Sequence, residues 1–140
     1  MEVLTLFEKL VQSLKAAGLD AEERQAYVGQ YYDGVDHGQY FPVVRVETDY
    51  NFPSKRLEGI CKRRGVVYDR RYHYGCGVMI YTIWTAADRE KARTLDAVAA
   101  TFQGAFWAYR HEHGPEDQAG MIAAGRRAVA MWQWLNNGRA

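Results

Sequence analysis

Basic and aromatic residues alternate through one short segment of the sequence, KRLEGICKRRGVVYDRRYHY, from Lys55 to Tyr74. Lysine and arginine neutralise phosphates, and tyrosine rings beside guanidinium groups can stack on nucleic-acid bases. Residues 51–73 carry seven basic and two acidic side chains, whereas residues 1–50 carry four basic and nine acidic ones. The net charge of +1 hides this asymmetry and argues against indiscriminate binding to duplex DNA. The segment therefore predicts a binding site for an anionic ligand.

The expected ligand-binding residues lie on a basic helix and on the hairpin strand that follows it. Alternate residues of a strand share a face, which would place Tyr68, Arg70 and Tyr72 together, with Asp69 and Arg71 behind them. The ligand would be a nucleic acid, a nucleotide or an acidic protein surface, and neither a cofactor nor a metal is expected. The full predicted set is Lys55, Arg56, Lys62, Arg63, Arg64, Tyr68, Arg70, Arg71, Tyr72 and Tyr74.

A purely structural explanation of the same residues stays open. The tyrosines would then pack under the long helix of the C-terminal half, and the arginines would pair with carboxylates of the acidic N-terminal part. Those carboxylates are Asp33, Asp36, Glu47 and Asp49. The sequence alone does not decide whether the acidic and basic segments neutralise each other.

Acidic residues suggest a second kind of site. Glu47 and Asp49 would share one face of a strand, and Asp69 and His73 would share a face of another. If these strands paired, three carboxylates and a histidine could hold Mg²⁺, which prefers oxygen ligands. Lys62, Arg70 and Arg71 would then grip a phosphodiester. This arrangement is the hypothesis of a metal-dependent nuclease.

Other patterns that carry chemistry are weak or missing. His111 and His113 are two residues apart, so on a helix they would point about 200° apart and not to one metal. Cys76 follows His73 in a glycine-flanked turn, but a hairpin tip offers little to exclude water from a reactive thiol. The phosphate-loop, dinucleotide-binding and GxSxG motifs are absent. We therefore expect a binding protein rather than an enzyme.

The many aromatic residues favour an alternative function. Trp107 lies off the apolar stripe of its predicted helix, and Trp132 and Trp134 cannot both face the same core. Tryptophan, tyrosine and arginine dominate the binding energy of protein interfaces. The chain could therefore be an inhibitor, an immunity factor or an adaptor that acts through an aromatic and arginine interface. A homodimer would also cover such rings.

The hydrophobic pattern predicts a single α+β domain over residues 1–140. It contains a small three-stranded, mainly antiparallel sheet in β-α-β-β order, two N-terminal helices and a C-terminal antiparallel helical hairpin. The expected helices run over about 2–17, from Asp20 to Tyr32, over 54–65, from Thr85 to His113, and onward from Pro115. The expected strands span 40–48, 66–74 and 78–85, with Pro42 at the start of a strand or on an edge.

Composition bounds the class of protein. With 140 residues, of which 48% are hydrophobic and 25% charged, the chain can bury one core and is not intrinsically disordered. No apolar run approaches the roughly 20 residues of a membrane span, so no membrane partner is expected. No export signal is recognised, and Cys61 and Cys76 are too few for a disulfide framework, which predicts a cytoplasmic protein with reduced thiols.

Overall fold

The computed structural model describes residues 4–29, 31–32, 35–49, 54–73, 75 and 77–137. The chain divides into two compact units, one formed by residues 1–26 and 40–90, the other by residues 27–39 and 91–140. That the two act as a single domain stays a prediction. Within the described residues, no helix combines the length and the apolar character needed to cross a membrane.

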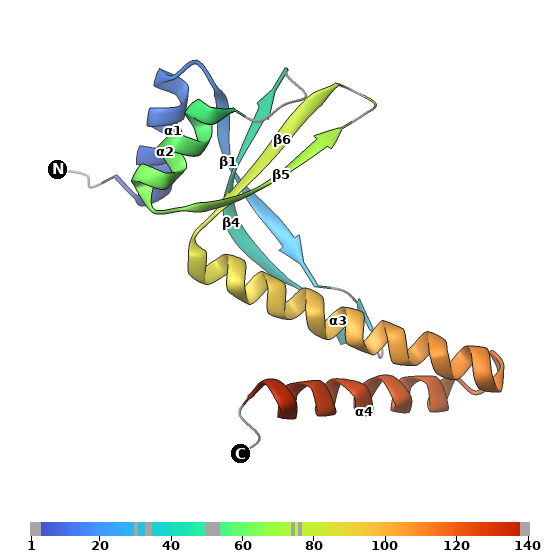
Figure 1. Cartoon of the computed structure of the whole chain (residues 1–140). Coiled ribbons are helices and arrows are strands. Elements are labelled where there is room, and N and C mark those ends of the chain that lie inside the picture. Colours follow the sequence, from blue (N-terminus) through green and yellow to red (C-terminus); the bar gives the residue numbers. More distant parts are fainter. Residues whose placement is uncertain are drawn as a thin grey trace. The chain divides into compact units, whose positions relative to one another are not determined.

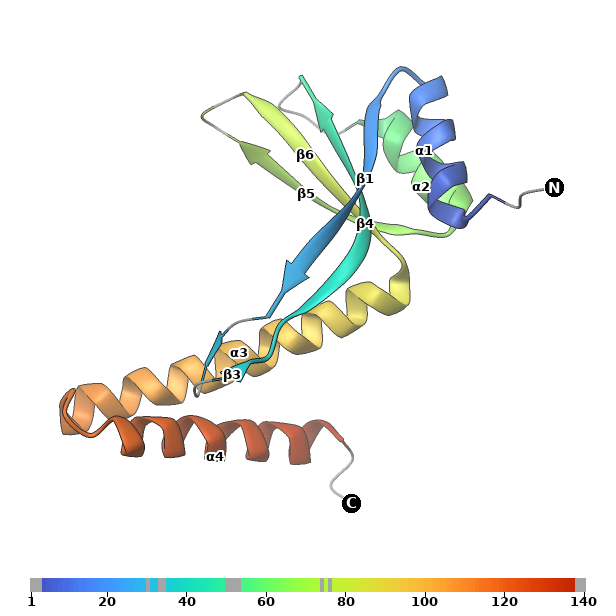
Figure 2. The same cartoon turned by 180° about the vertical axis from the view of Figure 1, so that it is seen from behind.

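The first unit is an antiparallel four-stranded sheet with two helices on one of its faces (Figure 1). The helices are α1 (Leu6–Ala16) and α2 (Lys55–Arg64), and the strands in spatial order are β1 (Asp20–Val28), β4 (Gln39–Thr48), β6 (Val78–Trp84) and β5 (Val67–His73). Figure 2 shows the same order from behind. Strand β6 pairs antiparallel with both β4 and β5, so β5 and β1 form the edges of the sheet.

Strand β1 corrects the sequence prediction, which placed a second helix after Asp20. That prediction relied on Asp20 and Glu23 at capping-box spacing and on Tyr27 and Val28 as part of an apolar face. The segment is instead extended beside β4, and Ala21 is its only fully buried residue. One buried side chain gives no alternating apolar pattern, and pairing with a neighbouring strand outweighs a local helix preference. The sheet therefore has four strands rather than three.

Helix α2 begins and ends where the sequence predicts. The Ser54 hydroxyl accepts a hydrogen bond from the Leu57 N–H at 3.2 Å, and Gly65 closes the helix in the left-handed conformation with φ of 69°. Helix α1 begins later than predicted, after Thr5, whose hydroxyl accepts from the Glu8 N–H at 3.1 Å. These caps fix the ends of the two helices that later form the candidate site.

Buried side chains of both helices and of the sheet form the core of the first unit. They include Phe7, Leu10, Leu14, Val44, Val46, Leu57, Ile60, Cys61, Met79, Tyr81 and Ile83. Tyr68 and Tyr72 are partly buried against this core, so their rings pack inside the fold as the purely structural explanation predicted. The helices that contribute to this core are α1 and α2 rather than the long C-terminal helix, so that detail of the prediction is wrong.

The predicted hairpin of β5 and β6 is confirmed, with Tyr68 opposite Ile83 and Tyr72 opposite Met79. Tyr74 and Cys76, which the sequence placed near its turn, lie outside the described residues. Strand β4 is internal, so the edge position suggested by Pro42 is wrong. This proline precedes the stretch of β4 that pairs with β6, Val44–Thr48, and so removes no hydrogen bond from that ladder.

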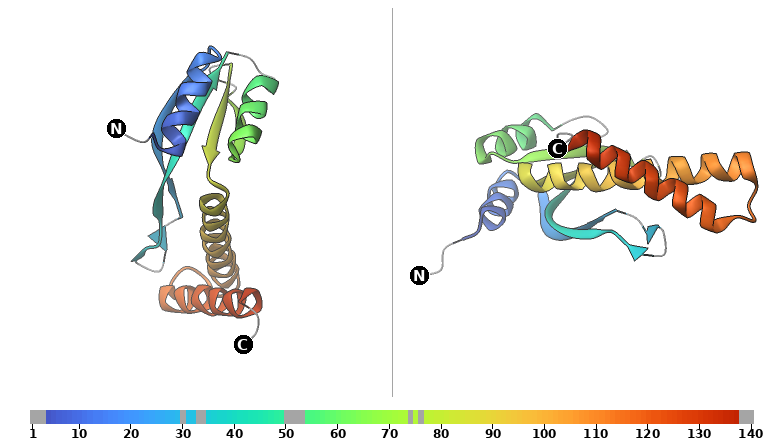
Figure 3. Two further views of the ribbon diagram at one scale, coloured as in Figure 1. Left: turned by 90° about the vertical axis from the view of Figure 1, so that its left-hand side faces the viewer. Right: turned by 90° about the horizontal axis from the view of Figure 1, so that it is seen from below.

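The second unit contains a helical hairpin and a short pair of strands. Helix α3 (Ala86–His113) belongs to it from residue 91 onward, followed by α4 (Gln118–Asn136), while β2 (Tyr31–Tyr32) pairs with β3 (Val35–Asp36). Figure 3 shows α4 running back along α3, which confirms the predicted hairpin. The Tyr109 hydroxyl donates to Asp117 Oδ2 at 2.5 Å. A Cβ atom at Gly125 would lie 2.5 Å from the Phe102 ring, so glycine allows the close approach of the helices.

Candidate anion-binding groove

An open groove with a volume of about 720 Å³ runs between α1 and α2. Its walls are Ser13 and Ala16 of α1, Ala17 directly after that helix, and Arg56, Ile60, Arg63 and Arg64 of α2. Three of these seven residues are arginines, and none is acidic. The groove therefore has the charge that an anionic ligand requires, within a volume typical of small-ligand sites.

Helical periodicity explains why these three arginines share a wall. Arg63 and Arg64 follow Arg56 by seven and eight residues, which is two turns of a helix. Ile60 lies about one turn from Arg56 and about one turn from Arg63. Its side chain is 5% exposed, so it anchors this side of α2 to the core. The same face of the helix thus combines one buried apolar side chain with three exposed guanidinium groups.

Two of the arginines are held by uncharged oxygen atoms of α1. Arg56 Nη1 donates to the Ala17 carbonyl at 3.1 Å, and Arg64 Nη2 donates to the Ser13 hydroxyl at 2.8 Å. A guanidinium has five N–H donors, so each contact leaves most of them available. The contacts orient the two side chains without neutralising their charges.

Arg63 has no hydrogen bond or ion pair within the described part of the chain. Its Nη1 atom lies beside Gly59, 3.5 Å from the point where a Cβ atom would stand. The negative ends of helix dipoles favour cations, which accounts for Arg56 at the C-terminal end of α1. Arg63 stands in the last turn of α2, so the dipole of its own helix also favours a cation there.

The two predicted lysines of α2 lie away from the groove. Successive residues of an α-helix are about 100° apart around its axis, so Lys55 points more than a quarter turn away from Arg56, and Lys62 more than a quarter turn away from Arg63. The two lysines are seven residues apart, as Arg56 and Arg63 are. Both lysines are exposed, and neither lines the groove. The predicted set of basic residues is therefore split between two sides of one helix.

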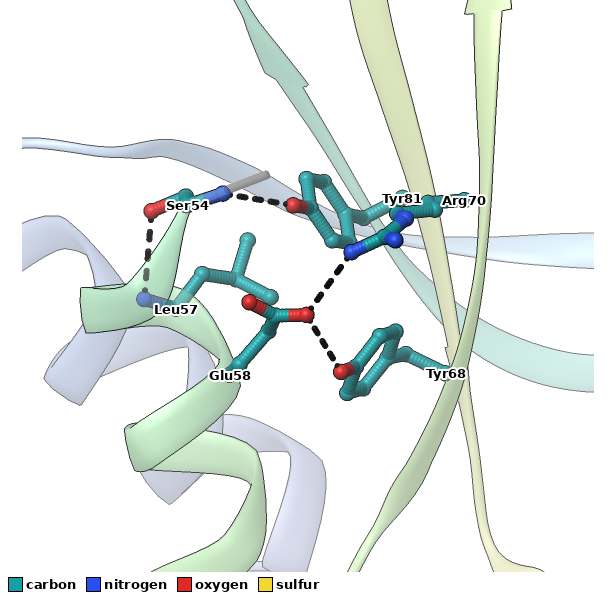
Figure 4. A network of polar contacts seen from close by, with 6 residues as sticks. All are labelled: Ser54, Leu57, Glu58, Tyr68, Arg70 and Tyr81. Carbon is teal, nitrogen blue, oxygen red and sulfur yellow. Dashed lines mark hydrogen bonds and ion pairs between the residues drawn. The ribbon is translucent and has the colours of Figure 1, made fainter. Parts of the chain in front are cut away.

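Arg70 is neutralised, which corrects its prediction as a free ligand-binding cation. Its Nη1 atom lies 3.0 Å from Glu58 Oε1, and the Tyr68 hydroxyl donates to the same oxygen at 2.5 Å (Figure 4). We call these three side chains the Glu58 network. Nearby, the Ser54 N–H donates to the hydroxyl of the fully buried Tyr81 at 2.7 Å, so α2 is tied to two strands.

The Glu58 network also changes the acid–base chemistry of Tyr68. Because its hydroxyl donates to the Glu58 carboxylate and is partly desolvated, the pKa of Tyr68 rises to about 12. The neutral phenol is therefore the form that the fold stabilises. With its hydroxyl engaged and its ring 5.7 Å from that of Tyr81, Tyr68 serves as a packing residue in this structure.

Tyr72 and Arg71, two further members of the predicted set, do not line the groove. Tyr72 is partly buried against the core, and the predicted Tyr74 lies outside the described residues. Arg71 is exposed, opposite Ile80 in the ladder, and alternates with Arg70 so that it faces the other side of the sheet. Arg71 has no ion pair with another described residue, and it lies on the face of the sheet opposite to Arg70.

Two of the four carboxylates proposed to quench the basic segment have other partners. Asp36 accepts from the Tyr27 hydroxyl and the Gly38 N–H, which together hold its pKa below the usual value. Glu47 pairs with Arg45 at 2.6 Å. Asp33 lies outside the described residues. The carboxylate that neutralises Arg70 comes from within the basic segment itself.

The strand order also separates the acidic residues of the nuclease hypothesis. Strand β6 lies between β4 and β5, so Glu47 and Asp69 are not on neighbouring strands. Asp69 accepts from the Trp84 indole at 3.1 Å and lies 2.8 Å from Arg89 Nε. Among the described residues, no group of three or more metal-binding side chains comes together.

The described cysteine, Cys61, is a core residue. Burial raises the pKa of its thiol to about 11, and the nearby charge of Glu58 adds to this effect. A thiol with this pKa stays protonated at neutral pH and is a poor nucleophile. Cys76, which the sequence analysis considered as a reactive thiol, lies outside the described residues.

No protein-family profile, curated protein or solved structure matches this chain. The functional argument therefore rests on the groove itself. Sequence reasoning found its arginines but missed the wall formed by Ser13, Ala16 and Ala17, which has no charge pattern to reveal it. It also missed the role of Glu58. The available signal for separating the arginines from the lysines was the apolar Ile60, which lies about one helical turn from Arg56 and from Arg63.

Proposed function

We propose that this chain is a non-catalytic binding protein that holds a phosphate-bearing ligand, a nucleotide or a nucleic acid, in the arginine groove between α1 and α2. The observation that carries the proposal is the concentration of Arg56, Arg63 and Arg64 along a groove whose described lining residues include no carboxylate. Guanidinium groups match phosphate oxygens in geometry and can form two parallel hydrogen bonds with them.

The neutral contacts of the groove support this role. Ser13 and the Ala17 carbonyl position two guanidinium groups before any ligand arrives, which lowers the entropy lost on binding. Arg63, which has no partner within the described residues, would make the first new contact. None of the described residues that line the groove is aromatic, so they offer contacts to phosphates rather than stacking surfaces for bases.

The test is a binding titration with two probes. Fluorescence anisotropy with a labelled oligo(dT) measures nucleic-acid binding, and calorimetry with inorganic pyrophosphate measures binding of a small phosphate ligand. The double variant Arg56→Glu with Arg63→Glu should weaken binding at least about a hundredfold, because two charge-assisted contacts are replaced by repulsion. Preference for one probe over the other would distinguish nucleic acid from nucleotide.

The matched control is Lys55→Glu with Lys62→Glu. It makes the same change in net charge on the same helix, at the same spacing, but outside the groove. We expect it to change affinity less than about threefold at physiological salt, where exposed charges are largely screened. An equal loss for both double variants would show diffuse attraction rather than a site, and binding of neither probe by the wild type would contradict the proposal.

A second candidate function, an inhibitor or adaptor that binds another protein, is supported by one observation in the second unit. Trp107 of α3 is 52% exposed, and the Arg110 guanidinium lies 4.9 Å from the centre of its ring. An exposed tryptophan with a stacked arginine is typical of interface hot spots. Trp107→Ala should abolish co-purification of a defined protein partner, and an unchanged complex would exclude this surface.

A further inference from the structure

Two arginine side chains of the groove reach from α2 to neighbouring points at the C-terminal end of α1. The Arg56 guanidinium donates to the Ala17 carbonyl, and the Arg64 guanidinium donates to the Ser13 hydroxyl. The Ala17 N–H donates to the Ser13 carbonyl at 3.2 Å, so these two anchoring residues are one helical turn apart, about 6 Å along the axis of α1. Two positive charges are therefore held closer together than the eight-residue spacing of the arginines, about 12 Å along α2, would suggest.

Arg63 brings a third positive charge to the same stretch of the groove. Its Nη1 atom lies beside Gly59, so the side chain is folded back about one turn toward the start of α2. Gly59 stands near the midpoint between Arg56 and Arg64. Glycine is unfavourable inside a helix, and here it leaves this side of α2 without a side chain that would crowd the guanidinium. The three guanidinium groups therefore converge on a short stretch of the groove.

We propose that the groove binds a chain of directly linked phosphates, such as the diphosphate or triphosphate of a nucleotide, and recognises the number of phosphates rather than the base. This inference rests on the proposed function. Linked phosphates share a bridging oxygen, so two or three of them concentrate several negative charges over a length of about one helical turn. The phosphates of a nucleic-acid strand carry one charge each and are separated by a sugar, so the same length of groove would hold fewer charges.

The lining of the groove explains why the base should not matter. Besides the arginines, the described lining residues are Ser13, Ala16, Ala17 and Ile60. Proteins hold bases by stacking them on aromatic or guanidinium planes and by hydrogen bonds to their edges. The Ser13 hydroxyl is already engaged with Arg64, and Ile60 is buried. Once the guanidinium groups bind phosphate, no described side chain of the lining remains to stack on a base or to read its edge.

The test is calorimetry of the full chain in metal-free buffer with phosphate, pyrophosphate, tripolyphosphate, ATP and UTP. We expect affinity to rise about tenfold with each linked phosphate, because each brings charge-assisted hydrogen bonds to a further guanidinium. ATP and UTP should bind within about threefold of each other, because the base makes no contact that distinguishes them.

Arg63→Gln should lower the affinity for tripolyphosphate about tenfold and the affinity for phosphate by less, because a single phosphate does not need all three guanidinium groups. The matched control is Lys62→Gln, which removes the same charge from the neighbouring residue outside the groove. It should change both affinities by less than about twofold at physiological salt.

Ser13→Ala tests the positioning of Arg64 without changing any charge. It removes the hydroxyl that holds this guanidinium, so the affinity for tripolyphosphate should fall about threefold. Gln12→Ala is the control, because Gln12 is an exposed neighbour on α1 that does not line the groove.

The outcomes separate this inference from the proposed function. Equal affinity for phosphate and tripolyphosphate, a preference for ATP over UTP of more than about tenfold, or equal losses in Arg63→Gln and Lys62→Gln would overturn the inference. Binding of oligo(dT) that depends on Arg63, without binding of tripolyphosphate, would overturn it and leave the proposed function intact. Binding of none of the probes would contradict the proposed function, and this inference with it.

Discussion

Arg63 in the groove and Arg70 in the Glu58 network carry the same charge in opposite surroundings. Arg70 shares a carboxylate oxygen with Tyr68, whereas Arg63 has no such partner among the described residues. The neighbours of Arg63, namely Arg56 and Arg64, are held by a carbonyl and a hydroxyl. The comparison teaches that a count of basic residues does not identify a binding site. The charge of each partner separates cations available to a ligand from cations already neutralised by the fold.

The largest change in folding stability is expected for Glu58→Gln, which tests the difference between Arg70 and Arg63. The variant keeps an acceptor oxygen but removes the charge that holds Arg70 and Tyr68, so the free energy of unfolding should fall by about 1 kcal/mol. The figure is modest because the Arg70 side chain is 44% exposed, and solvent screens the pair. Urea unfolding measures the change, and affinity for the phosphate probes should stay the same or rise slightly.

The control for this prediction is Glu22→Gln. Glu22 is a carboxylate of β1 that is 55% exposed and pairs only with its neighbour Arg24 among the described residues, so its loss should change stability by less than about 0.5 kcal/mol. If Glu58→Gln instead weakened probe binding as strongly as a change in the groove, the Glu58 network and the groove would not be separate regions.

A smaller effect is expected from pH. The folded-state pKa of Tyr68 is about 12, above the ordinary tyrosine value of about 10, because its hydroxyl donates to Glu58. A group with a raised pKa contributes stability that is complete below the unfolded pKa and is lost as pH rises through the folded pKa. The urea midpoint should therefore fall between about pH 10 and pH 12 by a greater amount in the wild type than in Tyr68→Phe. Equal slopes for both proteins would show that this hydrogen bond does not couple folding to pH.

Much of the first unit could be predicted from the sequence, for identifiable reasons. The spacing of apolar residues and the caps Ser54 and Gly65 define α2, and two β-rich runs around glycines define the hairpin of β5 and β6. Strand β1 could not be predicted, because Ala21 is its only buried residue and its partner β4 lies far along the chain. Pairing between distant strands leaves no local pattern in such a segment.

The candidate site was predictable in composition but not in arrangement. The sequence contains the arginines of the groove, but it does not show that α1 supplies uncharged oxygen atoms from Ser13 and Ala17. It also does not show that Glu58, three residues after Lys55, reaches across to Arg70 on β5. Both facts depend on how α2 rotates about its axis when Leu57, Ile60 and Cys61 enter the core.

The most direct test of the central claim compares Arg63→Ala with Arg70→Ala in one pair of experiments, a titration with labelled oligo(dT) and pyrophosphate and a urea unfolding curve. We predict that Arg63→Ala weakens binding about tenfold and leaves stability unchanged, because the Arg63 guanidinium has no hydrogen-bond or ion-pair partner among the described residues. Arg70→Ala should lower stability and leave affinity within about threefold. Equal losses of affinity in the two variants, or full affinity in Arg63→Ala, would contradict the account.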